Sequence, residues 1–185
     1  MTGFAQLPRK TPGGVTVAAT RRRARRRSRF GTQLIEKQNL KGIYGISEEQ
    51  LRRYYREALK RDVETGQALI ALLERRLDNA IFRAGFATTR RQARQMASHC
   101  LLVVDGRSVN IPSLSLRVGN FVCVKESKRA KSHFTNFAKR MQHAQPPSWL
   151  ELDVDHFGFK VIGMPTAEEA AIGADMQAVV ELLAR

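Results

Sequence analysis

Hydrophobic residues recur at helical spacing between residues 47 and 85, and polar residues fill the positions between them. In GISEEQLRRYYREALKR, Ser47 and Gln50 form the S-x-x-Q pattern of a capping box, so a first amphipathic helix is expected from there. Gly66 breaks the pattern. The following stretch, QALIALLERRLDNAIFRAG, predicts one second helix that ends at Gly85, because glycine adopts the left-handed end conformation at little cost.

The segment ATTRRQARQMASH, residues 87–99, predicts a short two-faced helix from about residue 89 to 98. Thr88 or Thr89 is its natural N-cap. Small apolar residues fall on one arc, against the preceding helix. The opposite arc carries polar side chains, namely Arg90, Arg91, Arg94, Gln95 and Ser98. Because no acidic residue lies between residues 88 and 104, this face favours phosphate binding over the alternative, a merely solvated helix face.

Alternating patterns in the second half of the chain predict β-structure. LLVVDGRSVNI reads as a hairpin turning at Asp-Gly, LRVGNFVCVKE as a second around Gly-Asn, and WLELDVDHFGFKVI as a third. SKRAKSHFTNFAKRMQ is helical in period, and its Phe134 and Phe137 are expected in the core rather than as stacking platforms for bases. MPTAEEAA predicts another short helix, and AVVELLA fits a strand or a helix. The fold class expected is α+β.

The charge balance points to a polyanionic partner. Lys and Arg number 32 against 17 Asp and Glu, a net charge of +15, with a pI near 10.8. This favours nucleic acid first and an anionic membrane surface second. Residues 21–29, RRRARRRSR, are expected to be disordered alone and to neutralise phosphates; an organelle transit peptide and a solvated tail are the alternatives.

Other functional classes lack their motifs. No run of about 18 apolar residues could cross a membrane. Cys100 and Cys123 lie far apart without a histidine cluster, so no zinc site and no disulfide framework is expected. Neither a P-loop nor a G-x-G-x-x-G pattern is present. We therefore expect no enzyme activity, metal, cofactor or small-molecule substrate.

The order of residues resembles one family closely. LLERRLDNAIFRAGFATTRRQARQMASHCLLVVDGRSVNIPS is similar to the signature of bacterial small-subunit ribosomal protein S4. FGTQLIEKQNLKGIYGISEEQLRRYY, PPSWLELD and VVELLAR resemble its flanking segments, so nearly all of residues 30–185 is covered. The resemblance implies a bilobed protein. A mostly helical lobe, residues 31–73 joined by 165–185, would accompany an inserted α/β lobe, residues 74–164, with the RNA-binding module of two helices and a hairpin at about 74–136.

The resemblance also implies a function. The family is a structural constituent of the small ribosomal subunit, binding its rRNA directly at a multi-helix junction early in assembly. It lies beside the mRNA entry channel, next to ribosomal protein S5, and contributes to translational accuracy. A bacterial cytoplasmic ribosome is expected, with an organelle ribosome as the alternative. Residues 1–30 would form a basic rRNA-binding tail.

The individual residues expected to bind RNA follow from the match to the RNA-binding module and from the pattern of basic residues. Near the mRNA entry, Arg23 and Arg26 are the nearest counterparts of the family's arginines. The residues expected to bind rRNA are Arg21, Arg22, Arg25, Arg27, Arg29, Arg52, Arg53, Arg75, Arg76, Arg90, Arg91, Arg94, Gln95, His99, Lys128, Arg129 and Lys131.

The sequence departs from the family pattern in three places. It lacks the N-terminal cysteine cluster that holds zinc in many members, so the first lobe is expected to begin shorter. Asp105 replaces the asparagine of the usual V-N-G turn, and Leu183-Ala184 replace a Tyr-Ser pair.

Two other functions compete with the ribosomal one. The same module occurs in off-ribosome RNA regulators or chaperones, and in RNA-modifying proteins such as pseudouridine synthases. Asp78, in RRLDN, resembles the catalytic aspartate of those synthases, but its neighbouring arginines favour a structural ion pair.

Overall fold

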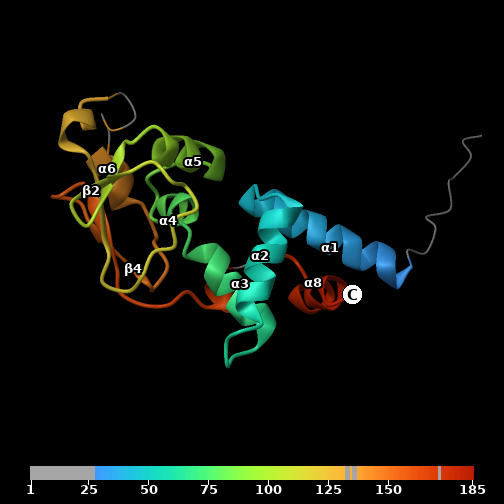
Figure 1. The fold of residues 1–185 in the computed structure, drawn as a ribbon. Coiled ribbons are helices and arrows are strands. Elements are labelled where there is room, and N and C mark those ends of the chain that lie inside the picture. Colours follow the sequence, from blue (N-terminus) through green and yellow to red (C-terminus); the bar gives the residue numbers. More distant parts are fainter. Residues whose placement is uncertain (1–27, 132–133, 135–136, 171) are drawn as a thin grey trace, which may run out of the picture.

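A computed structural model describes residues 28–131, 134, 137–170 and 172–185 of the chain. They form two lobes that lie side by side, one helical and one built on a sheet (Figure 1). The α+β, bilobed fold expected from the sequence is confirmed.

The helical lobe combines the beginning of the described chain with its C-terminal end. Its helices are α1 (Arg29–Tyr44), α2 (Glu48–Ala58), α3 (Thr65–Glu74), α7 (Ala167–Ala170) and α8 (Met176–Leu183). Helix α8 packs along α1, and Val179 of α8 joins Leu40, Leu51, Leu69 and Leu73 in a common apolar core. The C-terminal segment, for which a strand or a helix was expected, is therefore the helix that closes this lobe.

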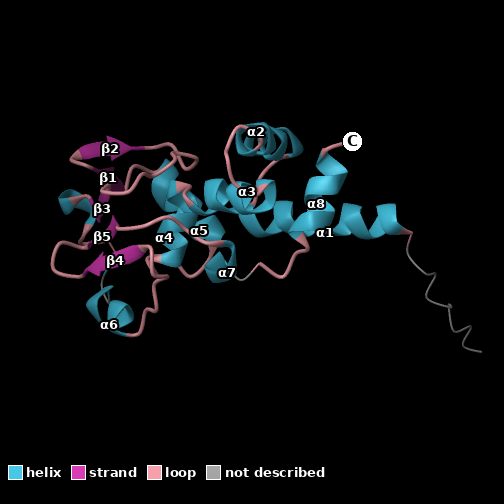
Figure 2. Ribbon diagram, turned by 90° about the horizontal axis from the view of Figure 1, so that it is seen from below, coloured by secondary structure: helices cyan, strands magenta, loops and turns pink. Residues whose placement is uncertain are grey.

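The second lobe packs helices against an antiparallel sheet. Its elements are α4 (Leu77–Arg83), α5 (Arg90–Ser98), β1 (Leu102–Val104), β2 (Arg107–Val109), β3 (Phe121–Val124), the 3₁₀ turn η1 (Glu126–Lys128), α6 (Phe137–Gln142), β4 (Leu150–Asp153) and β5 (Gly158–Val161). The strand order is β2-β1-β3-β5-β4, with every neighbouring pair antiparallel. Figure 2 shows this sheet at the end of the molecule away from α1 and α8.

A cluster of aromatic rings fills the core of the second lobe. Phe86 meets Phe137 edge-on with ring centroids 4.8 Å apart, and it meets Phe159 in the same way at 5.4 Å. Phe134 and Phe137 are both buried, which confirms that they belong to the core. Edge-to-face packing of this kind adds to the stabilisation that burial of the rings provides.

Local signals in the sequence mark several element ends correctly. Both hydrogen bonds of the capping box between Ser47 and Gln50 are present. The Thr89 hydroxyl caps α5 by accepting from the backbone N–H of Gln92. Gly85 has φ of +81° and follows α4, as expected for a glycine after a helix end. The hairpins β1/β2 and β4/β5 form as predicted.

The single helix expected over residues 67–85 is wrong, because the chain breaks between α3 and α4. Arg76 adopts an extended conformation with φ −65° and ψ 140°. The N–H groups of Leu77 and Asp78 donate to the carbonyls of Leu114 and Pro112, and Leu116 N–H donates to the Arg75 carbonyl. The segment of residues 112–116 therefore satisfies the backbone groups that a continuous helix would have paired internally.

Two smaller expectations also fail. The segment before Gly119 does not form a hairpin with β3, because β3 instead lies between β1 and β5. Gly119 has φ of +95°, and its N–H donates to the carbonyl of Val161. Gly66 does not separate two helices, since it lies inside the first turn of α3. For β3 and Gly119, tertiary partners decide what the local pattern could not.

Candidate nucleic-acid interface

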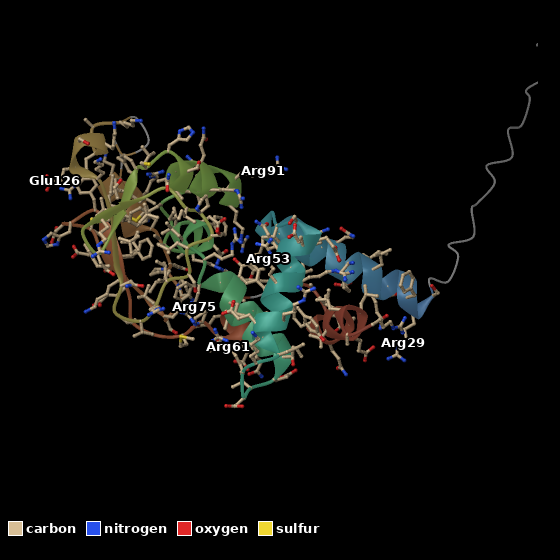
Figure 3. The ribbon with its side chains drawn as sticks, in the orientation of Figure 1. Arg29, Arg53, Arg61, Arg75, Arg91 and Glu126 are labelled. Carbon is tan, nitrogen blue, oxygen red and sulfur yellow. The ribbon has the colours of Figure 1, made fainter. Side chains whose placement is uncertain are left out.

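Helix α5 presents the cationic face expected from its sequence. Ala93, Met96 and Ala97 are buried against the second lobe. Arg91, Gln95 and His99 are exposed to solvent on other sides of the helix. Figure 3 shows Arg91 at the end of α5 that faces the helical lobe. The segment is therefore two-faced, with one side anchored and the other available to a partner.

A cavity of about 410 Å³ opens where α5 meets the end of α1. Both lobes contribute to its walls. The lining residues are Gly42, Ile43, Tyr44 and Gly45 from the first lobe with Asp78, Arg90, Arg91 and Arg94 from the second. Three arginines against one carboxylate give this cavity a net positive charge, and the Asp78 carboxylate is already paired with Arg76 and Arg94.

Arg90 is held rigidly at this cavity. Its guanidinium carbon lies 4.5 Å from the ring centroid of Phe82 and 5.2 Å from that of Tyr44. Its Nε donates to Oδ1 of Asn79 at 2.8 Å. The other two guanidinium nitrogens have no hydrogen-bond partner among the described residues. Burial lowers the pKa of Arg90 from its usual value, although the side chain stays charged at any physiological pH. A fixed cation with unused donors suits a phosphate oxygen.

Asp78 accepts from two arginines and is a structural residue. Arg76 contacts both of its oxygens, Nε at 3.0 Å and Nη2 at 2.6 Å. Arg94 reaches it at 3.3 Å while leaving 43% of its own side chain exposed. This ion-paired arrangement confirms the structural interpretation of the RRLDN segment over the catalytic one.

Arg76 was expected to face RNA, and the structure corrects this expectation. Its side chain is only 1% exposed, and its Nη1 donates to the hydroxyl of Tyr54 on α2 at 3.0 Å. Burial acts to lower its pKa, but the hydrogen bonds and charge of Asp78 outweigh that effect and the pKa is raised. Arg76 therefore joins the two lobes from inside, and its position offers no surface to RNA.

Arg75 lies half-buried at the lobe junction. Its Nε donates to the carbonyl of Leu116 at 2.6 Å. Its pKa is lowered by burial and by the positive charges of Arg61 and Arg117. Arg61 and Arg117 are cations that the sequence pattern did not single out, because neither belongs to a cluster of arginines.

The remaining expected residues lie on other surfaces and are not gathered at the cavity. On α2, Arg53 is exposed and paired with Glu49, and Arg52 lies 3.6 Å from Glu48. Lys37 and Lys41 hold the pKa of Glu48 below its usual value. Arg29 starts α1 and pairs with Glu181 at 2.8 Å.

The basic segment after β3 also lies apart from α5. Figure 3 places Glu126, which begins this segment, and Arg29 at opposite ends of the molecule, with Arg91 between them. Arg129 stacks 5.1 Å from the ring centroid of Phe157. Lys128 is partly buried and Lys131 is exposed. The residues expected in the tail, Arg21, Arg22, Arg23, Arg25, Arg26 and Arg27, lie outside the described residues.

Asp105 is exposed, but both oxygens of its carboxylate are hydrogen-bonded to residues next to the turn. One carboxylate oxygen accepts from the backbone N–H of Phe121 at 2.7 Å, and the other accepts from the side-chain amide of Asn120. The residue takes φ of +47° in the β1–β2 turn. The anion therefore braces the turn against the start of β3.

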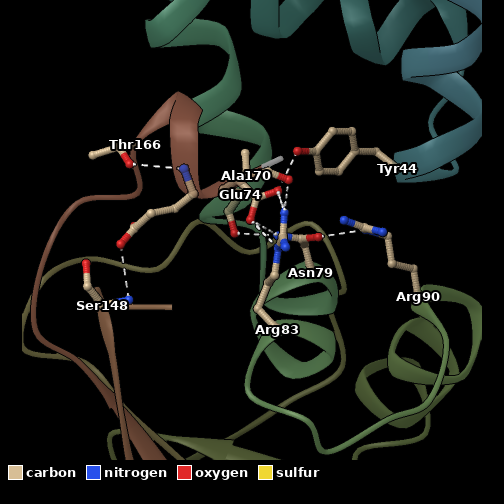
Figure 4. Close-up of polar contacts among 9 residues, drawn as sticks. Tyr44, Glu74, Asn79, Arg83, Arg90, Ser148, Thr166 and Ala170 are labelled. Carbon is tan, nitrogen blue, oxygen red and sulfur yellow. Dashed lines mark hydrogen bonds and ion pairs between the residues drawn. The ribbon is translucent and has the colours of Figure 1, made fainter. Parts of the chain in front are cut away.

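The sequence analysis missed the polar residues that join the lobes behind α5. Glu74 and Asn79 are each only 1% exposed. Glu74 accepts a hydrogen bond from Tyr44 on α1 and forms an ion pair with Arg83 on α4 (Figure 4). One signal was available: Glu74 and Asn79 interrupt the apolar stripe of residues 69–84, and buried polar groups require partners.

The described residues contain no group of three or more His, Cys, Asp or Glu side chains placed to hold a metal ion. No helix there is long and apolar enough to cross a membrane. Cys100 and Cys123 are both free, and burial raises the pKa of the Cys123 thiol.

Two family models cover most of the first two thirds of the chain. Residues 9–74 match the ribosomal protein S4/S9 N-terminal domain, and residues 75–122 match the S4 domain. The cationic helix α5 and the β1/β2 hairpin lie within the second match. Fold and site thus define a ribosomal protein built on an S4 domain.

Curated relatives match over nearly the whole chain. The small ribosomal subunit protein uS4 of Chloroflexus aurantiacus is 42% identical over 179 residues, covering 96% of this chain and 86% of the relative. The uS4 protein of Roseiflexus sp. is 43% identical over 166 residues, covering 88% and 81%. That of Kosmotoga olearia is 41% identical over 161 residues, covering 87% and 77%. This chain belongs to the uS4 family of small-subunit ribosomal proteins. The family is structural rather than enzymatic, in agreement with the expectation from the sequence.

Proposed function

We propose that this protein is a structural component of the small ribosomal subunit that binds small-subunit rRNA directly. One observation carries the proposal: Arg90, Arg91 and Arg94 line a single cavity between the lobes, where two guanidinium nitrogens of Arg90 have no partner in the part of the chain that the structure describes. Arginines in this arrangement match the phosphate groups of an RNA backbone.

The mode of recognition follows from the kinds of side chain present. Arginine contacts to phosphates depend on the path of the backbone and carry little base information. Double-stranded RNA hides its base edges in a deep and narrow major groove, so proteins read mainly its shape. Cations on α2, on α5 and after β3 lie on separate surfaces, which suits a partner with several helices. We therefore propose a multi-helix rRNA junction as the binding site, with Arg52, Arg53, Arg75, Lys128, Arg129 and Lys131 as additional contacts.

Finer features of the proposal rest on the family resemblance. They are binding early in subunit assembly, a position near the mRNA entry channel with Arg23 and Arg26 facing mRNA, contact with ribosomal protein S5, and a role in translational accuracy. The setting proposed is a bacterial cytoplasmic ribosome. The basic tail of residues 1–30 would neutralise phosphates of the rRNA, because a block of like charges favours a polyanionic partner.

Sedimentation of lysate from source cells tests the ribosomal role. The chain is followed by mass spectrometry across a gradient at moderate and at high salt. Near-stoichiometric retention in the small subunit after the salt wash is the expected result. Recovery in light fractions alone would instead favour an RNA-binding regulator or chaperone that acts off the ribosome.

A further inference from the structure

Glu74 is a buried carboxylate on which four hydrogen bonds from side chains converge. Its Oε1 accepts from the hydroxyl of Tyr44 and from Nη2 of Arg83 at 3.1 Å. Its Oε2 accepts from Nε of Arg83 at 2.9 Å and from the side-chain amide of Asn79 at 2.9 Å. Figure 4 shows these side chains converging on Glu74 from α1 and α4. Tyr44 belongs to the helical lobe, so one carboxylate ties the two lobes together.

Asn79 connects this carboxylate to the cavity. Its amide N–H groups donate to Glu74, to Oε2 and to the backbone carbonyl at 3.0 Å. Its amide oxygen is thereby left pointing the other way, where it accepts from Nε of Arg90 at 2.8 Å. A carboxylate can only accept hydrogen bonds, so the negative charge of Glu74 fixes which end of the Asn79 amide faces Arg90.

Tyr44 provides a second connection between Glu74 and Arg90. The hydroxyl that donates to Glu74 sets the position of the Tyr44 ring, and the Arg90 guanidinium lies over that ring. Burial and the charge of Glu74 raise the pKa of Tyr44, which keeps its hydroxyl a donor. Arg83 extends the network by donating to the carbonyl of Ala170 at the end of α7.

We propose that Glu74 is a positioning residue for RNA binding. Through Asn79 and Tyr44 it fixes the direction of the Arg90 guanidinium in the interlobe cavity, and through Arg83 and Tyr44 it fixes the two lobes that form the cavity walls. The proposal rests on the proposed rRNA-binding function. It assigns a role in RNA binding to a side chain that no RNA can reach.

A double-mutant cycle tests the proposal with the full chain and transcribed bacterial small-subunit rRNA. Glu74→Gln keeps the shape of the side chain but replaces one of its two acceptor oxygens with an NH₂ group. That NH₂ group would then face one of the N–H or O–H donors that the carboxylate now satisfies. We expect the dissociation constant to rise about tenfold, the effect of one charge-assisted hydrogen bond. In an Arg90→Met background, Glu74→Gln should change the constant less than about twofold, because the residue through which it acts is gone.

A salt titration adds a quantity, the salt dependence of binding, that would not change if Glu74 had only a structural role. Loss of the Arg90 contact should flatten the dependence of log K on log salt by about one unit in Glu74→Gln. Glu64→Gln is the matched control, because Glu64 lies just before α3 and accepts from Gln67, away from the cavity and from the expected rRNA contacts. It should leave both the affinity and the slope unchanged.

Each outcome has a defined meaning. An equal loss of affinity in the wild-type and Arg90→Met backgrounds, or no loss, would overturn the positioning role while rRNA binding stands. Failure of the wild-type chain to bind would remove the proposed function itself, and the inference with it. If Glu74→Gln does not fold, Asn79→Ala replaces it in the same cycle under the same criterion, because it breaks the link to Arg90 and leaves the Glu74–Arg83 pair.

Discussion

Replacing the buried Arg76 with methionine should strongly lower the free energy of unfolding of the second lobe. Arg76 and Asp78 are 1% and 5% exposed, and two hydrogen bonds of 3.0 Å and 2.6 Å join them. Removing one partner of a buried ion pair costs about 3–5 kcal/mol, since the other charge is left without compensation. Arg94 still reaches Asp78 at 3.3 Å, so we expect the lower end, about 3 kcal/mol. That loss corresponds to a fall in Tm of about 6–12 °C.

The chain contains a convenient probe for this measurement. Its single tryptophan, Trp149, is buried in the core of the second lobe. Urea denaturation followed by tryptophan fluorescence therefore reports on the lobe that contains the Arg76–Asp78 pair. Arg53→Met is the matched control, because the Arg53–Glu49 pair is exposed on α2 and its loss should cost less than about 1 kcal/mol.

The double variant Arg76→Met/Asp78→Leu distinguishes the pair from its individual charges. Removing both partners leaves no unpaired buried charge, so much of the lost stability should return. A destabilisation below about 1 kcal/mol for Arg76→Met alone would refute the reasoning, because it would mean that Asp78 is not desolvated as its burial indicates.

Three further predictions concern stability. Ser47→Ala removes the cap of α2 and should lower the free energy of unfolding by about 1 kcal/mol in urea denaturation. Gly158→Ala should cost about 1–3 kcal/mol in the same assay, since a Cβ there would lie 2.6 Å from the Phe121 ring; wild-type stability would contradict this. The raised pKa of Tyr44 means that the unfolded chain releases a proton at lower pH than the folded one, so stability should fall as pH rises above about 10. Tyr44→Phe should lose stability less steeply in that range, and identical pH profiles would refute this assignment.

Local chemistry made much of the fold predictable. The Ser47–Gln50 box and the Thr89 cap involve residues within three positions of each other, so no tertiary knowledge is needed to recognise them. The hairpin at Asp105-Gly106 likewise follows from the residues of its own turn. The cationic arc of α5 follows from helical geometry alone.

Long-range partners explain what the sequence could not predict. The helix break at Arg75–Arg76 depends on residues 112–116, about 40 positions away, which take over its backbone hydrogen bonds. Arg76 looks like any surface arginine until Asp78 and Tyr54 are seen to enclose it. The same holds for Glu74, whose partner Tyr44 lies 30 residues earlier on another helix. Arginine-rich segments therefore predict that a protein binds polyanions, but they do not predict which of its arginines make the contacts.

The salt dependence of rRNA binding tests the central claim most directly. Wild-type protein and the variant Arg90→Gln/Arg91→Gln/Arg94→Gln would be titrated with transcribed bacterial small-subunit rRNA over a range of salt concentrations. If these arginines contact phosphates, the variant should bind more weakly, and its slope of log K against log salt should flatten by up to about three units. A folded variant with the wild-type slope would contradict the account and place the RNA-binding surface elsewhere on the molecule.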